Sequence, residues 1–200
     1  MNLKDEISLQ TGDIILFSGN TWISRIIQYV GRSSYSHIGI ILKNPRFLNL
    51  EDGIYLLESG YNPIPDSENH TIKYGVQIHL LDDVLKRCTK RSVFVRHVQC
   101  VRDEEFYERL SKVHSEIHDK PYDLNLFDWT NAEYNLFCPR SISKTFQITD
   151  RFWCSALVTY VLESLGLIED VNWTLVAPRE FGKGGSLKWK CHITDEELLF

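Results

Sequence analysis

The chain lacks several patterns that mark well-known classes of protein. It has no run of about 20 apolar residues, so we expect no transmembrane helix. No block of lysine and arginine stands out and the formal net charge is −5, so we expect no nucleic-acid partner. Residues 1–10 lack the basic segment and apolar core of a signal peptide, which favours an intracellular protein.

The cysteines lack the pairing that a disulfide framework needs. Their number is odd, no Cys-x-x-Cys pair occurs, and they are spread widely, at Cys88, Cys100, Cys138, Cys154 and Cys191. We therefore expect reduced thiols, the form from which a nucleophilic thiolate can arise.

The composition is that of a globular protein. Hydrophobic residues make up 43% of the 200 residues and charged residues 24%, which indicates a single domain over residues 1–200. Hydrophobic periodicity and turn residues predict strands at 14–17, 36–42, 53–59, 76–80 and 93–98, and helices at 21–30, 81–88, 103–118 and 150–165. Because most strands precede the two long helices, we predict an α+β fold.

Cys154 is a candidate nucleophile because of its place in the helix predicted over residues 150–165. With Asp150 as the N-cap and Gly166 just past the end, Cys154 falls about one turn into the helix. Free backbone N–H groups and the positive end of the helix dipole lie there and favour a thiolate. The alternative is a small buried cysteine that packs beside Trp153.

His37 is the candidate base. It stands at the start of an apolar strand, and if its face is buried it needs a polar partner. A hairpin formed by residues 36–42 and 53–59 places Glu58 directly opposite His37, where a carboxylate would orient the imidazole. The alternatives are an ion pair at a strand edge, or a register shifted by one residue that separates the two side chains.

A histidine pair on the helix predicted over residues 103–118 has the spacing of metal ligands. His114 and His118 lie four residues apart, but Ser115 stands where the zinc-protease pattern His-Glu-x-x-His has glutamate. No third ligand is evident from the sequence. We therefore interpret the pair as part of a solvated helix face and predict no metal and no cofactor.

Three short motifs occur in a characteristic order. Residues 12–17 (Gly-Asp-Ile-Ile-Leu-Phe) join a Gly-Asp pair to an apolar strand, and residues 36–40 (Ser-His-Ile-Gly-Ile) hold a histidine strand followed by Glu58 in the next strand. Residues 153–158 (Trp-Cys-Ser-Ala-Leu-Val) form a cysteine-bearing helix start. Together they resemble the circularly permuted branch of the NlpC-type papain-like superfamily, and within it the YaeF/YiiX-like amidases, which have poxvirus relatives.

The resemblance spans about residues 11–181 and implies a fold and a set of roles. The fold is a permuted papain-like one, with a small antiparallel sheet packed on a nucleophile-bearing helix. His37 and Glu58 precede Cys154 in the chain, the order of the permuted branch. The resemblance implies Cys154 as nucleophile, His37 as base and Glu58 as the orienting acid.

The activity implied is that of a cysteine peptidase or amidase. Such a thiol hydrolase cleaves an amide bond, in a peptide or an N-acyl compound, through a thioester acyl-enzyme. Two alternatives stay open: a lipid acyltransferase or phospholipase on the same triad, which would contact a membrane surface, and a non-catalytic binding protein that keeps the fold. Tyr35 shares the strand face of His37 and is a candidate to line the site.

Overall fold

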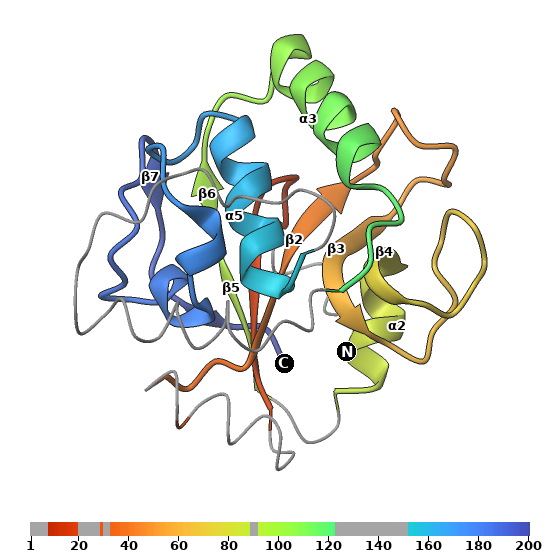
Figure 1. Cartoon of the computed structure of the whole chain (residues 1–200), viewed down its shortest axis with the longest axis horizontal. Helices are drawn as coiled ribbons and strands as arrows, with labels where there is room; N and C mark the ends of the chain where they lie inside the picture. The colour runs from red at the N-terminus through yellow and green to blue at the C-terminus, as the bar shows by residue number, and fades with distance from the viewer. Residues whose placement is uncertain (1–7, 20–28, 30–32, 89–91, 123–151) are drawn as a thin grey trace.

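A six-stranded sheet dominates the part of the chain that the computed structural model describes, which is residues 8–19, 29, 33–88, 92–122 and 152–200 (Figure 1). Its strand order is β4-β3-β2-β1-β5-β8, and every neighbouring pair is antiparallel. The strands are β1 (Ile14–Ser18), β2 (His37–Lys43), β3 (Ile54–Tyr61), β4 (Tyr74–Leu80), β5 (Ser92–Arg96) and β8 (Glu197–Leu198).

Helices cover this sheet, and Figure 1 shows α5 and α3 in front of it. The described helices and the remaining strands are α2 (Leu81–Lys86), β6 (Val98–Gln99), α3 (Glu104–Ile117), α5 (Cys154–Ser164), the 3-10 helices η3 (Trp173–Leu175) and η4 (Pro178–Phe181), and β7 (His192–Ile193). None of the helices in the described residues combines the length and the apolar character needed to cross a membrane.

The two faces of the sheet bury separate hydrophobic clusters. Alternate residues of a strand point to opposite faces, so Ile38 and Ile40 pack with α3 and α5, whereas Ile41 packs with α2. The C-terminal end of the chain belongs to the same structure, because β8 pairs with β5 and Leu199 is buried in the α2 cluster. The sheet and its hydrophobic cluster therefore include residues after 181, where the resemblance in sequence ends.

The predicted α+β class is confirmed, and β1 to β5 begin close to the predicted positions. The helix predicted over residues 21–30 falls almost wholly outside the described residues. The helix predicted over 103–118 is α3, and Asp103 is its N-cap, since its carboxylate accepts a hydrogen bond from Phe106 N at 3.0 Å. Its apolar stripe is buried, as the spacing of three and four residues predicts.

The predicted start of the cysteine helix is wrong. We expected Asp150 as the N-cap, but α5 begins at Cys154 and its N-cap is Trp153, in an extended conformation. The helix cannot begin earlier because Phe152 N donates to Pro121 O at 3.1 Å, which keeps this part of the chain extended. The predicted end is confirmed, since Gly166 has the positive φ of 74° typical of the residue after a helix.

Candidate active site

Cys154 is the first residue of α5, so its thiol stands at the N-terminal end of the helix. The first helical hydrogen bond runs from Leu157 N to Trp153 O at 3.0 Å. The N–H groups of the first turn therefore have no acceptor within the helix. Cys154 carries a free thiol and is 7% exposed, which leaves it a narrow opening to solvent. An anion at this place is stabilised by the helix dipole.

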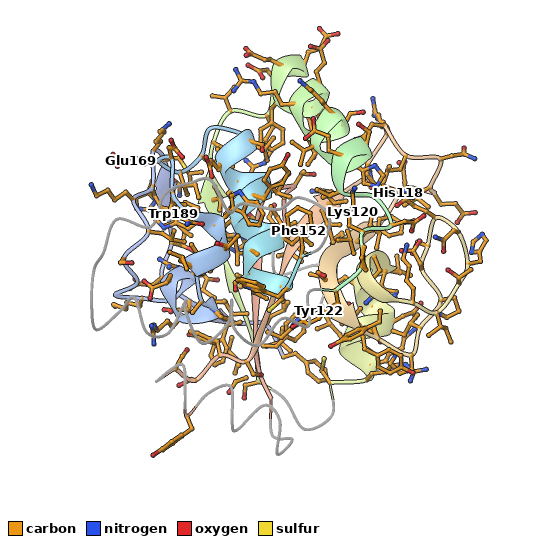
Figure 2. The ribbon with its side chains drawn as sticks, viewed as in Figure 1. His118, Lys120, Tyr122, Phe152, Glu169 and Trp189 are labelled. Atoms are coloured by element: carbon orange, nitrogen blue, oxygen red, sulfur yellow. The ribbon has the colours of Figure 1, made fainter. Side chains whose placement is uncertain are left out.

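The chain that leads into Cys154 is held by two neighbouring segments. The hydroxyl of Ser59, fully buried in β3, donates to Phe152 O at 2.6 Å. Tyr122 forms a parallel bridge with Phe152, and Figure 2 shows both residues beside the start of α5. The position of the thiol is thus fixed by the sheet as well as by the helix.

His37 is the first residue of β2, and its ring contacts the two groups that the sequence analysis assigned to it. Its Nε2 lies 2.6 Å from Oε2 of Glu58, and the thiol of Cys154 is close enough to contribute to the raised pKa of the ring. Since Nε2 faces the carboxylate, Nδ1 is the nitrogen left for the thiol. The ring packs against Phe17 with centroids 5.5 Å apart. The structure therefore brings Cys154, His37 and Glu58 together.

The predicted register of the hairpin is wrong by two residues. Glu58 stands opposite Gly39, and the same register carries His37 opposite Gly60. A shift of two keeps both side chains on one face, so Glu58 reaches the ring diagonally instead of directly. Gly60 leaves room for the imidazole, because a Cβ there would lie 3.3 Å from Cε1 of His37.

The register is set by the turn that joins β2 to β3. Asn44 adopts the left-handed conformation, with φ of 46°, and its N–H donates to Gly53 O at 2.8 Å. In return Gly53 N donates to Oδ1 of Asn44, also at 2.8 Å. The last paired residues of β2 and β3 are Lys43 and Ile54. The two hydrogen bonds between Asn44 and Gly53 continue this pairing by one residue and close the hairpin.

His37 and Glu58 each shift the pKa of the other so that both groups are charged. Burial alone lowers the pKa of His37, but hydrogen bonds to Cys154 and Glu58, with the negative charges on these groups, outweigh it and raise the pKa from 6.5 to about 10. Burial alone raises the pKa of Glu58, but hydrogen bonds and positive charges from His37 and His79 hold it far below its ordinary value of 4.5. At neutral pH the pair is an imidazolium and a carboxylate.

His79 is a site residue that the sequence analysis missed. It is fully buried on β4, with Nδ1 at 3.1 Å from Oε1 of Glu58 and Nε2 at 3.0 Å from Ile64 O. Both ring nitrogens face oxygen atoms, which fixes the orientation of the ring. The available signal was the alternation of Gln77 and His79 with apolar residues, which places a histidine on the face of the sheet that carries Glu58.

Further polar contacts complete the surroundings of Glu58. The side-chain amide of Asn62 donates to Oε1 at 3.2 Å. Oε1 therefore receives Asn62 and His79, while Oε2 receives His37. Each oxygen of this buried carboxylate has a donor, which offsets the cost of removing its charge from water.

Tyr35 lies just before β2 and is directed to the C-terminal part of the chain. Its hydroxyl donates to Oε1 of Glu196 at 3.1 Å and its ring packs edge-on against Phe94. Burial, followed by the charge of Glu196, raises the pKa of Tyr35 to about 12. Its hydroxyl is therefore engaged with a carboxylate, and a role at the thiol stays a prediction.

The interpretation of His114 and His118 as a solvated helix face is wrong for His114. His114 is buried, with 9% of its surface exposed, and Glu68 from the β3–β4 connection lies against it. Among the described residues, Glu68, His114 and His118 form a group whose ligand atoms are close enough to hold a metal ion. The third ligand was missed because Glu68 is distant from α3 in the sequence.

Comparisons with known proteins add evidence on the fold. Neither a protein-family model nor a curated protein matches the chain. Among solved structures, the chain is similar to the crystal structure of YiiX from Escherichia coli O157:H7, which is described as a metalloprotein. The TM-score is 0.53 with 23% sequence identity, and the match covers 82% of this chain and 71% of YiiX. A likeness at this identity shows the fold alone.

The structural neighbour is YiiX, of the YaeF/YiiX family that the sequence motifs resemble. The fold-level part of the resemblance therefore agrees with the structure. The permuted papain-like relationship and the chemistry of the site stay predictions.

Proposed function

We propose that the chain is a thiol hydrolase that cleaves an amide bond through an acyl-enzyme on Cys154. One observation carries the proposal: Cys154 is the first residue of a helix, and its thiol acts on the ring of His37, which in turn hydrogen-bonds Glu58. This is the relation of nucleophile, base and orienting group that covalent catalysis requires.

Two features favour a thiolate at Cys154. The N-terminal end of α5 stabilises a negative charge, and the carboxylate of Glu58 keeps the neighbouring ring of His37 positively charged. The positive ring of His37 next to Cys154 is the arrangement that generates a nucleophilic thiolate.

The proposed reaction has two halves. The sulfur of Cys154 attacks the carbonyl carbon of the amide, and a C–S bond forms as the C–N bond breaks. His37 gives its proton to the departing nitrogen, which leaves as an amine. In the second half His37 takes a proton from water, the hydroxide attacks the thioester, and the C–S bond breaks to release the acid. Glu58 keeps the ring oriented throughout.

The first turn of α5 supplies donors for the oxyanion that forms on the carbonyl oxygen. The N–H groups of this turn are not used inside the helix, and they lie next to the attacking sulfur of Cys154. Fixed backbone donors at such a position stabilise developing negative charge without rearrangement.

An aromatic surface next to the thiol is suited to contact the substrate. Tyr122 forms a bridge with Phe152, two residues before Cys154, and burial, followed by the negative charge of Cys154, raises the pKa of Tyr74. The ring of Tyr74 is 44% exposed and stacks on Tyr122 with centroids 4.6 Å apart. We infer that this pair forms a wall for an apolar part of the peptide or N-acyl compound.

The test is a comparison of the reactivity of all thiols in the folded chain. Timed labelling with iodoacetamide at neutral pH, mapped by mass spectrometry, should modify Cys154 first. Burial raises the pKa of Cys100 and of Cys191, which makes these two half-buried thiols poor competitors. Faster labelling of any other cysteine would show that Cys154 is not the activated thiol.

A matched pair of variants shows whether the histidine is responsible. His37→Gln should slow labelling of Cys154 by about tenfold, since the imidazolium that supports the thiolate is gone. His192→Gln changes an exposed histidine on β7 and should leave the rate unchanged. Equal rates in the two variants would contradict the proposed role of His37.

A further inference from the structure

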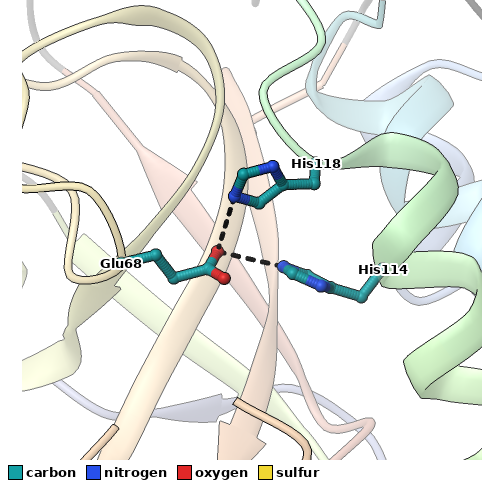
Figure 3. Close-up of side chains that lie close together, drawn as sticks. All are labelled: Glu68, His114 and His118. Carbon is teal, nitrogen blue, oxygen red and sulfur yellow. Dashed lines mark hydrogen bonds and ion pairs between the residues drawn. The ribbon is translucent and has the colours of Figure 1, made fainter. Parts of the chain in front are cut away.

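A second cluster of titratable side chains lies between α3 and the loop that joins β3 to β4. Oε2 of Glu68 is 3.0 Å from Nε2 of His114 and 3.7 Å from Nε2 of His118 (Figure 3). All the ligand atoms lie within 4.8 Å of one another. His114 is in the last turn of α3 and His118 caps the helix, so the helix presents both rings to the loop.

The three donor atoms converge on one point. A single carboxylate oxygen faces the Nε2 atoms of both rings, instead of each oxygen facing its own partner. Bonds of about 2.0–2.2 Å from a tetrahedral zinc ion hold its donors roughly 3.3 Å apart. The observed separations of 3.0 Å and 3.7 Å bracket that spacing. We propose that Glu68, His114 and His118 bind one divalent transition-metal ion of the zinc type.

The ring of His118 is already oriented for a metal. Its Nδ1 lies 3.3 Å from Oδ2 of Asp119, which leaves Nε2 for the ion. Asp119 is in turn held by Lys73 and by the side-chain amide of Asn69, which donates to it at 2.9 Å. A histidine ligand whose other nitrogen donates to a carboxylate is the common arrangement in metal sites, because it fixes the tautomer.

The loop that carries Glu68 is anchored to the sheet. Asp66 is fully buried, and its Oδ1 accepts hydrogen bonds from Glu68 N at 2.8 Å and Asn69 N at 3.2 Å. Its Oδ2 accepts from Ile78 N of β4 at 2.8 Å. Glu68 is therefore presented by a loop fixed to the sheet, and a site whose ligands are held in advance loses little entropy when it binds an ion.

The donor set selects the kind of ion. Two imidazole nitrogens with one carboxylate suit zinc and its neighbours in the first transition row, whereas magnesium and calcium favour oxygen ligands. His114 is buried against the ring of Phe47, with centroids 5.8 Å apart, while the side chain of His118 is 36% exposed. The exposed side leaves a coordination position for water.

The ion would join two parts of the fold. It ties the β3–β4 loop to the end of α3, and the chain that follows α3 pairs with β4, since Val76 N donates to Lys120 O at 2.8 Å. Figure 2 shows His118, Lys120 and Tyr122 along this connection, which ends beside Phe152. A bound ion would therefore hold in place residues 119–122, the segment that bridges to Phe152 just before Cys154. This proposal does not depend on the proposed hydrolase activity.

The experiment is zinc titration of the full chain without an affinity tag, after removal of metals with a chelator. Calorimetry should detect one high-affinity zinc ion per chain, and zinc should raise the melting temperature. Glu68→Gln and His118→Ala should each weaken binding by more than about 100-fold, and Asp119→Asn by about 10–100-fold. Glu108→Gln and His192→Ala change exposed residues of the same types and should bind zinc like the unaltered chain.

Cys154→Ala separates this site from the thiol, which can also ligate zinc. Retained binding in Cys154→Ala, together with cobalt spectra that lack thiolate charge-transfer bands, supports the proposal. The proposal is wrong if the unaltered chain binds no zinc, if Glu68→Gln and His118→Ala bind as tightly as it does, or if Cys154→Ala alone removes binding. Circular dichroism of each variant confirms that the loss is not one of folding.

Discussion

In the part of the chain that the structure describes, a glutamate stands between two histidines in two clusters, and these clusters differ in geometry. Glu58 uses its two oxygens separately, Oε2 for His37 and Oε1 for His79. Glu68 directs one oxygen at both His114 and His118. The first arrangement is divergent and the second is convergent.

The difference teaches how the same residue types serve different chemistry. In the divergent cluster each ring also faces a second group: Cys154 acts on the ring of His37, and Nε2 of His79 lies 3.0 Å from Ile64 O. The contacts therefore run in a line through the two oxygens of Glu58. In the convergent cluster three lone-pair donors meet at one point beside solvent. Side chains linked one after another through Glu58 are arranged for proton transfer. Three ligand atoms that point at one place, as around Glu68, are arranged to bind a metal ion.

The largest expected effect is on catalysis at the divergent cluster. Cys154→Ala should lower hydrolysis of any amide that the chain cleaves by at least about three orders of magnitude, because the covalent route is lost. Folding should change by only about 1 kcal/mol. Hydrolysis rates and thermal melts measure the two effects. Undiminished hydrolysis by the variant would remove Cys154 from the mechanism.

The same substitution at the two glutamates tests the comparison directly. Glu58→Gln should lower the free energy of unfolding by about 3 kcal/mol, because the buried ring of His79 and the half-buried ring of His37 lose their carboxylate partner. Glu68→Gln, in the cluster beside solvent, should cost about 1 kcal/mol. Urea denaturation of both variants, without added metal, measures the difference. Equal losses would mean that the two clusters do not differ in the way their geometry indicates.

The titration of His37 provides a more specific measure of Glu58. In Glu58→Gln the pKa of His37 should fall from about 10, since the negative neighbour that favours the charged ring is gone. Titration of the ring by NMR in both proteins shows the change. An unchanged titration would show that Glu58 is not the electrostatic partner of the ring.

Stability should depend on pH in a window set by His37. Its pKa is raised from 6.5 to about 10 in the folded chain, so its contribution is complete below about pH 6.5 and is lost as the pH rises towards 10. The pKa of Glu58 is lowered, so its contribution is present above about pH 4.5 and is lost on further acidification. Thermal melts across this range should show the alkaline decline, and His37→Gln should flatten it.

The smallest expected effect is at His79, which does not contact the sulfur. His79→Gln keeps a side chain on the face of β4 but removes the ring nitrogen that faces Oε1 of Glu58, so labelling of Cys154 should slow by about threefold. The pH profile of labelling should also shift, which a merely structural role would not cause. Gln77→Asn, a change to another buried residue of β4, is the control.

The sequence predicted those parts of the fold that depend on local pattern. The apolar stripe of α3 could be predicted because helix periodicity acts over three and four residues, whereas the cap at Asp103 was seen only in the structure. The shared face of His37 and Glu58 was also predicted, since it depends only on the alternation of side chains along strands. The register was not, because the left-handed Asn44 and its bonds to Gly53 decide it.

The features that the sequence did not reveal depend on contacts between distant segments. The start of α5 is decided by Phe152, which is bound to the connection after α3. His79 joins the site because β4 pairs with β3, and Glu68 reaches α3 across a loop whose path depends on buried Asp66. The residue pattern within one segment gives no information on contacts with a distant segment, so these contacts could be found only in the three-dimensional structure.

One strand, β3, is bonded both to His37 and to the segment that leads into Cys154. Adjacent residues of β3 act in opposite directions: Glu58 bonds His37, and Ser59 bonds Phe152, two residues before Cys154. If β3 slides or tilts relative to the rest of the sheet, it carries both attachments with it. The separation between the ring of His37 and the sulfur of Cys154 is therefore kept when β3 moves.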